Sequence, residues 1–453
     1  MSANLKINKI LVANRGEIAV RVIRAAKELN IQTIAVYSKA DVDALHTRLA
    51  DEKVCIGEPP SQQSYLFYQN LLGAAESLRA DAIHPGYGFL AENPDFAAAS
   101  QALGIKFIGP APDSMRLMAH KSVAKQKMKE AGVPVIPGSE QSVESLPEAK
   151  ELADKIGYPI ILKAAEGGGG KGMRIVNSIG ELKSNFLNAT QEAEKAFNSG
   201  ELYIEKYLPN SRHIEVQILG DEAGNIVHLF ERECSVQRNH QKLLEETPCA
   251  FLTPTIRDEI CSKAVDAAKN IGYHSAGTVE FLYDIDNDEF YFMEMNTRIQ
   301  VEHPVSEMIT GVDILKKQIE IAAGEQLNLK QSDIINSGHA IECRINAENW
   351  KQGFRSSPGN IEKFTLPGGP GIRVDTAFEA NSKVLPYYDS LLAKLIAYGA
   401  DREESIQRMQ RALAEFIVTG VHTTIGFHKK ILKNKRFVKS DISTSFVENE
   451  FKF

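Results

Sequence analysis

The chain has 453 residues, 43% of them hydrophobic and 25% charged, which indicates two to four globular domains. Its formal net charge of −7 provides no basic field for a polyanion, so nucleic acid is excluded as an expected partner. The five cysteines form no C-x-x-C pair, which favours a reduced cytoplasmic protein without structural zinc, and no apolar run reaches the ~18 residues of a membrane span.

The N-terminal part of the sequence alternates short buried-strand runs with helical spacing. Strands are expected at residues 9–14, 34–37, 82–84 and 106–109, with helices between them. This alternation predicts an α/β domain with a doubly wound parallel sheet over residues 1–115. A nicotinamide-binding domain is disfavoured, because the first strand–helix turn has one glycine where that fingerprint needs three.

The remainder of the sequence has an α+β character. A helix is predicted from Met115 to about Gly132, and a hairpin from Ala276 to Asn296 with its turn around residues 286–288. Other strands are expected at residues 158–163, 173–176, 201–206 and 213–219, and further helices at 313–323 and 402–416. The charge-dense run 231–242 is typical of a solvated surface loop.

A glycine cluster occupies residues 167–172. It matches G-x-G-x-x-G, but a strand-like run follows it where a dinucleotide fingerprint needs a helix. It is not a P-loop either, because Gly172 stands where a serine or threonine should follow the lysine. We expect a mobile turn that closes over phosphates, with Lys163 directed at the same phosphates, and a flexible hairpin turn is the alternative.

Two glutamates of the predicted hairpin are expected to face each other. If the turn is centred on Asn287, Glu280 lies directly opposite Glu294 in apolar surroundings. A cation would relieve this repulsion, and hard oxygen ligands suit Mg²⁺, to which Asn296 can add an amide oxygen. The alternative is that one glutamate is protonated or is paired with lysine or arginine.

Three polar residues follow the hairpin at alternate positions. On an extended backbone Arg298, Gln300 and Glu302 would point to one side. An arginine fork, an amide and a carboxylate could hold a planar oxyanion such as bicarbonate and remove its proton. The alternative is the solvated face of an ordinary strand.

Together these motifs resemble the biotin carboxylase family of the ATP-grasp superfamily over nearly the whole chain. The resemblance is carried by residues 10–18, 84–90, 163 with 167–173, 234–238 with 240–242, 294–304, 342–348 and 386–390. It implies an ATP-grasp fold over residues 120–322 with a mobile glycine-rich lid at about 136–208, and a C-terminal α+β domain over 338–447.

The resemblance also implies roles for individual residues. The nucleotide would lie between the lid and the C-terminal part, in contact with Lys121, Lys163, Gly169, Gly170, Glu205, Lys206, Tyr207, Leu208, His213, Gln237, His240, Glu280, Leu282 and Glu294. Two Mg²⁺ or Mn²⁺ ions would be held by Glu280, Glu294 and Asn296. Bicarbonate would contact Lys242, Arg298, Gln300, Val301 and Glu302. Glu302 would be the base, Arg344 would face the ureido oxygen of biotin, and Lys242 and Arg298 complete the catalytic set.

By the same resemblance, bicarbonate deprotonated by Glu302 attacks the γ-phosphate of ATP and forms carboxyphosphate. This breaks to CO₂ and phosphate, the phosphate takes the N1′ proton of biotin, and Arg344 stabilises the enolate that becomes carboxybiotin. The sequence holds no Met-Lys-Met type biotin acceptor, so a separate biotin carboxyl carrier protein is the expected partner. Carboxyltransferase subunits and a homodimer are expected as well.

The expected role is the first half-reaction of acetyl-CoA carboxylase in fatty acid synthesis, or alternatively that of pyruvate carboxylase. Two departures concern ATP contacts: Ala119 and His120 precede Lys121 where many relatives carry Gly-Asp, and Glu166 replaces a small residue. The alternative is another ATP-grasp ligase, such as glycinamide ribonucleotide synthetase or carbamoyl phosphate synthetase. Such a ligase should lack the combination of Lys242, Arg344 and the polar face formed by Arg298, Gln300 and Glu302. A catalytically silent nucleotide-binding module is disfavoured because every expected polar group is present.

Overall fold

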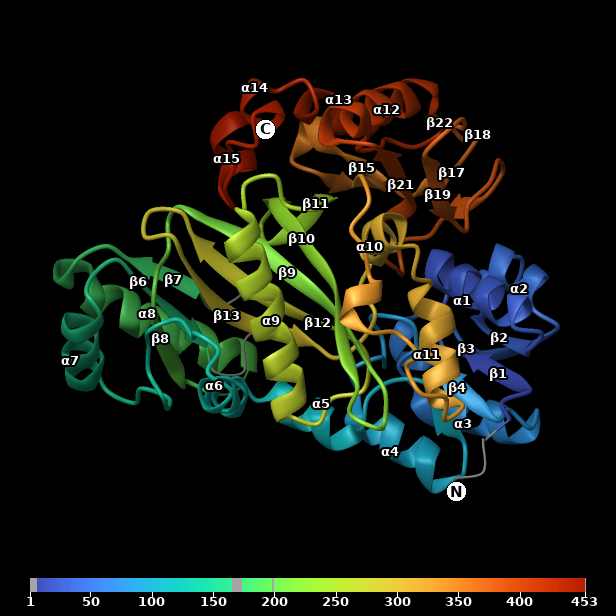
Figure 1. Ribbon diagram of the computed structural model, residues 1–453, viewed down its shortest axis with the longest axis horizontal. Helices are drawn as coiled ribbons and strands as arrows, with labels where there is room; N and C mark the ends of the chain where they lie inside the picture. The colour runs from blue at the N-terminus through green and yellow to red at the C-terminus, as the bar shows by residue number, and fades with distance from the viewer. Residues whose placement is uncertain (1–5, 165–172, 198, 453) are drawn as a thin grey trace.

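The N-terminal region forms a five-stranded parallel sheet in the computed structural model, which describes residues 6–164, 173–197 and 199–452 of the chain (Figure 1). The strand order is β3 (Glu52–Gly57), β2 (Gln32–Ser38), β1 (Lys9–Val12), β4 (Ala82–His84) and β5 (Lys106–Phe107). The accompanying helices are α1 (Gly16–Glu28), α2 (Leu45–Leu49), α3 (Tyr68–Ser77) and α4 (Pro94–Ala102). Because the order reverses direction at β1, the predicted doubly wound sheet is confirmed.

The helix predicted from Met115 to Gly132 is two helices, so that prediction is wrong. α5 (Pro112–Ala119) ends and α6 (Lys121–Glu130) begins at His120, whose backbone is extended at φ −89° and ψ 101°. The break makes Lys121 the first residue of a new helix. Its backbone N–H therefore lies at the positive end of the α6 dipole, which favours a bound anion.

A small subdomain projects from one side of the molecule (Figure 1). Its antiparallel sheet has the order β7 (Met173–Val176), β6 (Ile160–Ala164) and β8 (Leu202–Lys206). α7 (Leu146–Ile156) and α8 (Ile179–Phe197) pack on one face of this sheet, against Ile160, Leu162 and Ile204. The glycine cluster, with Gly169, Gly170 and Glu166, lies outside the described residues.

An eight-stranded antiparallel sheet forms the centre of the molecule (Figure 1). Its order is β13 (Glu289–Asn296), β12 (Ser275–Asp284), β9 (Ser211–Gly220), β10 (Ile226–Arg238), β11 (Gln241–Thr247), β14 (His339–Asn346), β21 (Leu391–Gly399) and β19 (Ile372–Thr376). β11 pairs with β14, Leu244 lying opposite Cys343. One sheet therefore runs through both the ATP-grasp and the C-terminal regions expected from the sequence.

One face of this sheet packs apolar side chains against two helices, α9 (Pro254–Asn270) and α12 (Arg402–Glu415). α12 lies close to the amphipathic helix predicted at 402–416. α10 (His303–Thr310) and α11 (Ile314–Ala322) follow β13, and α10 contacts β10, β14 and β21.

The remaining α-helices and strands are α13 (Ile425–Ile431), α14 (Lys435–Val438), α15 (Phe446–Glu450) and the short strands β15 (Glu348–Asn349), β16 (Arg355–Ser356), β17 (Gly359–Asn360), β18 (Lys363–Thr365), β20 (Lys383–Val384) and β22 (Ile417–Thr419).

The charged run 231–242 is not a solvated loop. It forms the end of β10, a tight turn at Asn239 and His240, and the start of β11. Both turn residues have positive φ, 48° and 62°, as a two-residue hairpin turn of type I′ requires. Glu231, Arg232 and Glu233 are buried, because each finds an oppositely charged partner inside the molecule.

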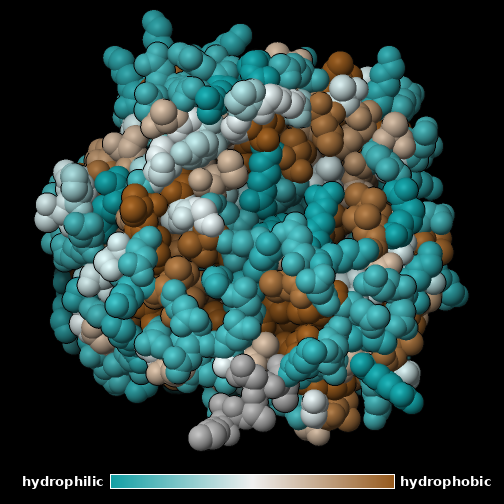
Figure 2. Space-filling view, turned by 45° about the vertical axis from the view of Figure 1, so that its right-hand side comes forward, coloured by the Kyte–Doolittle hydropathy of each residue, from teal (hydrophilic) through white to brown (hydrophobic). Residues whose placement is uncertain are grey.

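Hydrophilic side chains cover most of the face shown in Figure 2, and apolar residues appear there as separate patches. Among the described helices, none combines the length and the apolar character needed to cross a membrane. The candidate site lies instead among the buried polar groups of the central sheet.

Candidate active site

The β12–β13 hairpin places Glu280 opposite Glu294, as the sequence predicted. The turn itself is displaced from the expected centre, since Asp284 pairs with Glu289 and Phe281 with Phe292. An extra residue, Met293, then bulges from β13 and shifts the register by one. The opposition of the two glutamates thus depends on this bulge as well as on the turn.

The two glutamates have different surroundings. Glu294 is solvent-exposed, which contradicts the expected apolar setting, whereas Glu280 is buried. The Glu280 carboxylate lies 2.9 Å from His213 Nε2 and accepts hydrogen bonds from Lys242 at 3.0 Å, Asn296 at 2.8 Å and Gln300 at 2.7 Å. Burial alone would raise the pKa of Glu280, but Lys242 and His213 hold it below its usual value. The sequence-based alternative of a glutamate paired with lysine therefore describes Glu280 in this structure.

Lys242 is the centre of the polar group. Its ammonium lies 2.5 Å from Glu215, 3.0 Å from Glu280 and 2.8 Å from Glu302. Burial acts to lower the pKa of Lys242, and the three carboxylates outweigh that effect and raise the pKa well above its usual value. The Lys242 ammonium therefore holds together carboxylates from β9, β12 and the start of α10.

Glu302 lies between two cations. It is the N-cap of α10 at φ −80° and ψ 7°, so the extended backbone predicted at this residue is wrong. One carboxylate oxygen accepts from Lys242 and the other from Arg344 Nη2, at 2.9 Å. Arg344 also donates to Glu245 at 2.6 Å. Burial acts to raise the pKa of Glu302, but Lys242 and Arg344 hold it well below its usual range.

The other two members of the predicted polar face reach the same group. Arg298 donates to Asn296 Oδ1 at 2.8 Å and to Glu92 at 2.9 Å. Gln300 joins Glu280 to Arg232, whose Nη2 donates to Gln300 Oε1 at 2.6 Å. The structure thus brings Arg298, Gln300 and Glu302 to one polar group through a turn.

Three of the candidate nucleotide residues, Lys121, Lys163 and Glu205, lie near one another. Lys163 and Lys125 both bind the buried carboxylate of Glu205. Burial would raise the pKa of Glu205, but these lysines lower it to about 2. The pKa of Lys121 is lowered by burial and by the charge of Lys163, which lies near enough to repel it.

The remaining candidates are less closely connected. The Lys206 ammonium donates to the carbonyls of Gly157 and Tyr158 inside the lid. The rest are placed as follows: Tyr207 and buried Leu208 directly after β8, Gln237 opposite Lys242, Leu282 on β12, and His240 at the exposed β10–β11 turn. Their roles as nucleotide contacts therefore stay predictions from the sequence.

Several charged residues with partners in or near the site were not predicted from the sequence: Glu92, Lys125, Glu215, Arg232, Glu245 and Lys394. Arg232 has the most contacts, donating to Glu215, Gln217, Thr278, Gln300 and Ser306 at 2.6–3.1 Å. A usable signal was Glu215 and Gln217 alternating with Ile214, Val216 and Ile218, which predicts one polar and one apolar face of the strand.

Replacing Arg232 with methionine should cost about 3–5 kcal/mol of unfolding free energy, because it leaves buried Glu215 with one cation fewer and four other acceptors unpaired. Urea unfolding measures the loss. The matched control is Arg411→Met, which breaks an exposed pair with Glu415 and should cost below ~1 kcal/mol. Equal losses in the two variants would contradict the structural role of Arg232.

Two groups of side chains among the described residues could hold a metal ion. One combines His213, Glu215 and Glu280, and the other Glu215, Cys234 and Glu302, with donor atoms within 4.8 Å of one another in each. Glu294 belongs to neither group. Its exposed carboxylate, opposite Glu280 and beside Lys121, nevertheless has the oxygen donor chemistry that Mg²⁺ prefers.

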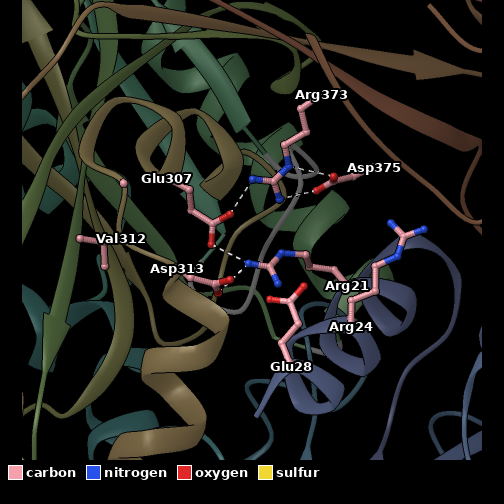
Figure 3. Close-up of a pocket in the computed structure, with 9 residues that line it drawn as sticks. Arg21, Arg24, Glu28, Glu307, Val312, Asp313, Arg373 and Asp375 are labelled. Atoms are coloured by element: carbon pink, nitrogen blue, oxygen red, sulfur yellow. Dashed lines mark hydrogen bonds and ion pairs between the residues drawn. The ribbon is translucent and has the colours of Figure 1, made fainter. Parts of the chain in front are cut away.

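A separate surface cavity of about 330 Å³ contains none of the candidate residues (Figure 3). It is lined by Arg21, Arg24, Glu28, Glu307, Gly311, Val312, Asp313, Arg373 and Asp375. Figure 3 shows Arg373 bound to both Asp375 and Glu307, and Arg21 bound to both Glu307 and Asp313. Its charges are therefore largely satisfied by one another.

Comparison with known proteins decides the family. Residues 6–115 match the biotin carboxylase N-terminal domain, 120–330 the ATP binding domain of the carbamoyl-phosphate synthase L chain, and 342–449 the biotin carboxylase C-terminal domain. Biotin carboxylase 1 of Bacillus subtilis is 53% identical over 98% of both chains. The chain belongs to the biotin carboxylase family. It is an ATP-dependent carboxylase, an enzyme of the ligase class.

Relatives named for other carboxylases reach a similar sequence identity. A pyruvate carboxylase subunit from Methanothermobacter thermautotrophicus is 54% identical over 97% of this chain and 89% of its own. The biotin carboxylase domain dimer of Hydrogenobacter thermophilus 2-oxoglutarate carboxylase, solved with MgADP, ADP and bicarbonate, has a TM-score of 0.93 and 51% identity, covering 98% of this chain and 97% of that one. The ATP-grasp fold expected from the sequence is confirmed.

Proposed function

We propose that this enzyme uses ATP and bicarbonate to carboxylate biotin on a carrier protein, through carboxyphosphate. The observation that carries the proposal is the buried Glu302 carboxylate, bound at once to Lys242 and to Arg344. A carboxylate base with one cation for an anionic substrate and another for biotin suits both halves of the reaction. The Campylobacter jejuni biotin carboxylase was solved as a β-γ-ATP complex, and the H. thermophilus domain with MgADP, ADP and bicarbonate.

The first step needs a base for bicarbonate. Lys242 and Arg298 offer charge-assisted hydrogen bonds to the anion, and Gln300 offers an amide within the same group. Before the anion binds, Lys242 and Arg344 depress the pKa of Glu302. Bicarbonate carries its own negative charge to Lys242, so the pKa of Glu302 should rise on binding and improve Glu302 as a base.

The second step needs a site for the phosphates of ATP. Lys121 begins α6, so both the charge of this lysine and the positive end of the helix would attract a phosphate. Lys163 is near enough to lower the pKa of Lys121 by repulsion. An anion would relieve this repulsion, which supports both lysines as phosphate contacts. The proposed lid at 136–208 would close over them and exclude the water that hydrolyses carboxyphosphate.

We assign Glu280, Glu294 and Asn296 to Mg²⁺, with Mn²⁺ as a substitute. The two carboxylates are opposite each other, and Glu294 is exposed to the solvent from which the nucleotide must come. Bound magnesium would neutralise charge that develops on the phosphates. In the ligand-free protein Lys242 compensates Glu280, so the metal and this lysine share that carboxylate.

Replacing Glu294 with glutamine should raise the Mg²⁺ concentration that gives half-maximal ATPase activity by at least ~10-fold, because one charged ligand is lost. Magnesium titration at saturating ATP measures it. Glu289→Gln is the matched control, since Glu289 is an exposed glutamate on the same strand and lies opposite Asp284 in the strand register, near the turn. An unchanged magnesium requirement for Glu294→Gln would refute the assignment.

The last step transfers the carboxyl group to biotin. Phosphate released from carboxyphosphate takes the N1′ proton, and the ureido oxygen gains negative charge. Arg344 is placed to stabilise this charge, because its guanidinium lies beside Glu302 and is oriented by Glu245. CO₂ then joins N1′, so the products are carboxybiotin, ADP and phosphate.

A biotin-dependent assay tests the whole proposal. ADP release should require bicarbonate and increase when free biotin is added, because free biotin can replace the carrier-bound form as substrate. ATP turnover that ignores both compounds would refute the proposal and favour another ATP-grasp ligase.

The partners follow from the product. Carboxybiotin must pass to a carboxyltransferase, and we propose a separate biotin carboxyl carrier protein as substrate and a homodimer in a cytoplasmic complex. A 2-oxoglutarate carboxylase relative was solved as a domain dimer. Relatives named for different carboxylases reach similar identity, which supports a choice of final acceptor by the transferase and not by this chain. We propose acetyl-CoA as the acceptor and pyruvate as the alternative, and purification with the native carrier would distinguish them.

A further inference from the structure

Lys394 is a fully buried lysine of β21 that the proposed reaction does not use. Its ammonium donates to the carbonyl oxygen of Val301 at 3.0 Å and lies 3.1 Å from Glu17 Oε2 and 3.9 Å from Asp375 Oδ2. Burying an ammonium is costly unless charge and hydrogen bonds compensate it. A lysine at this position is therefore expected to have a specific task.

The three partners of Lys394 come from separate parts of the fold. Glu17 lies in α1 of the N-terminal region and binds the hydroxyl of Tyr87. Asp375 lies in β19 and binds Arg373, as Figure 3 shows. Val301 directly precedes Glu302. Lys394 therefore links the N-terminal region and β19 to the residue beside the candidate base.

The contact with Val301 controls a single peptide unit. The backbone turns between Gln300 and α10, where the Gln300 carbonyl accepts from the backbone N–H of His303. The Val301 carbonyl belongs to the peptide that leads into Glu302, and a charged donor fixes its direction. The direction of this peptide sets where the Glu302 side chain begins, and hence its reach to Lys242 and Arg344.

We propose that Lys394 is a positioning residue that fixes the Val301–Glu302 peptide so that the Glu302 carboxylate faces Lys242 and Arg344. The proposal rests on the proposed role of Glu302 as the base. It assigns to Lys394 no contact with substrate, since its ammonium is occupied by protein groups. Its loss should therefore affect the bicarbonate step and spare nucleotide binding.

The test compares Lys394→Met with the double variant Glu17→Gln, Lys394→Met. The double variant removes one buried carboxylate together with the ammonium, so it keeps the local charge closer to balance if the single variant folds poorly. In both, kcat for bicarbonate-dependent ATP hydrolysis should fall at least ~10-fold and the KM for bicarbonate should rise, while the KM for ATP stays within about twofold. Glu17→Gln alone keeps the Val301 contact and should retain most activity.

Arg402→Met is the matched structural control. Arg402, the first residue of α12, is a partly buried cation that binds Glu246 of β11 at 2.6 Å, and its hydrogen bonds are to residues other than 300–302. If Lys394→Met lowers thermal stability like Arg402→Met and leaves both KM values and kcat unchanged, Lys394 has only a structural role and the inference is overturned.

Glu302→Gln separates this inference from the proposed function. If Glu302→Gln remains active, the assigned base is wrong, whatever Lys394 does. If Glu302→Gln is inactive while both Lys394 variants have wild-type kinetics, the proposed function stands and the positioning role is refuted. A crystal structure of the double variant should show the Glu302 carboxylate withdrawn from Arg344, and an unmoved carboxylate also counts against the inference.

Discussion

Replacing Glu302 with glutamine should lower bicarbonate-dependent ATP hydrolysis at least ~10²-fold, the usual range for loss of a general base, while ATP still binds. Glutamine has nearly the same shape, so it can accept hydrogen bonds from Lys242 or Arg344 but cannot take a proton from bicarbonate. Steady-state ADP release measures the loss, and titration calorimetry with a non-hydrolysable ATP analogue measures nucleotide affinity.

The matched control is Glu307→Gln. Glu307 is a buried glutamate of the same helix, α10, and its carboxylate binds Arg21 and Arg373 away from the Lys242 group. Its replacement should reduce stability but leave the bicarbonate-dependent rate within a few-fold of wild type. Full activity in Glu302→Gln, with Glu307→Gln also active, would show that another group accepts the bicarbonate proton.

The opposition of Glu280 and Glu294 illustrates what local sequence can predict. Strand pairing in a hairpin follows from the turn, and a turn near Asp286–Asp288 was evident from the run of polar residues. The predicted turn centre was displaced, and the bulge at Met293 restored the expected pair. The prediction was right partly because two local deviations cancelled, and a bulge of this kind has no distinct sequence signal.

The charged run 231–242 shows what local sequence could not predict. Charge density normally indicates solvent, and here it marks two central strands whose charges are matched by distant residues. Arg232 finds Glu215 on β9 and Gln300 after β13, partners far away in sequence. Only the folded sheet brings these charged groups together. The burial of Arg232 and its partners therefore cannot be predicted from the sequence of one strand.

The end of the polar face was mispredicted for a related reason. Alternation at Arg298, Gln300 and Glu302 suggested a strand, but His303 and Pro304 begin a helix immediately afterwards. Proline is well suited to the first turn of a helix, so this was an available signal. The break at His120 carried a weaker signal, because no glycine or proline marks it.

Replacing Lys242 with methionine should abolish carboxylation and destabilise the fold by about 3–5 kcal/mol near neutral pH, since Glu215, Glu280 and Glu302 lose their shared ammonium. Urea unfolding at several pH values measures this. Lys242 depresses the pKa of Glu280 and Glu302, so its stabilisation is fully present above their ordinary pKa of 4.5 and is lost as pH falls. The deficit of the variant should therefore shrink below that pH.

Lys9→Met is the control for this prediction. Lys9 also binds a carboxylate, that of Glu52 at 2.7 Å, but at a partly exposed position in the N-terminal sheet, so its removal should cost below ~1 kcal/mol. A Lys242→Met deficit that is equally small, or that grows as the solution is acidified, would show that the three carboxylates do not depend on this ammonium. Arg344 would then be the cation that holds the Glu302 carboxylate, and Lys242 could no longer explain why Glu215, Glu280 and Glu302 lie together in the sheet.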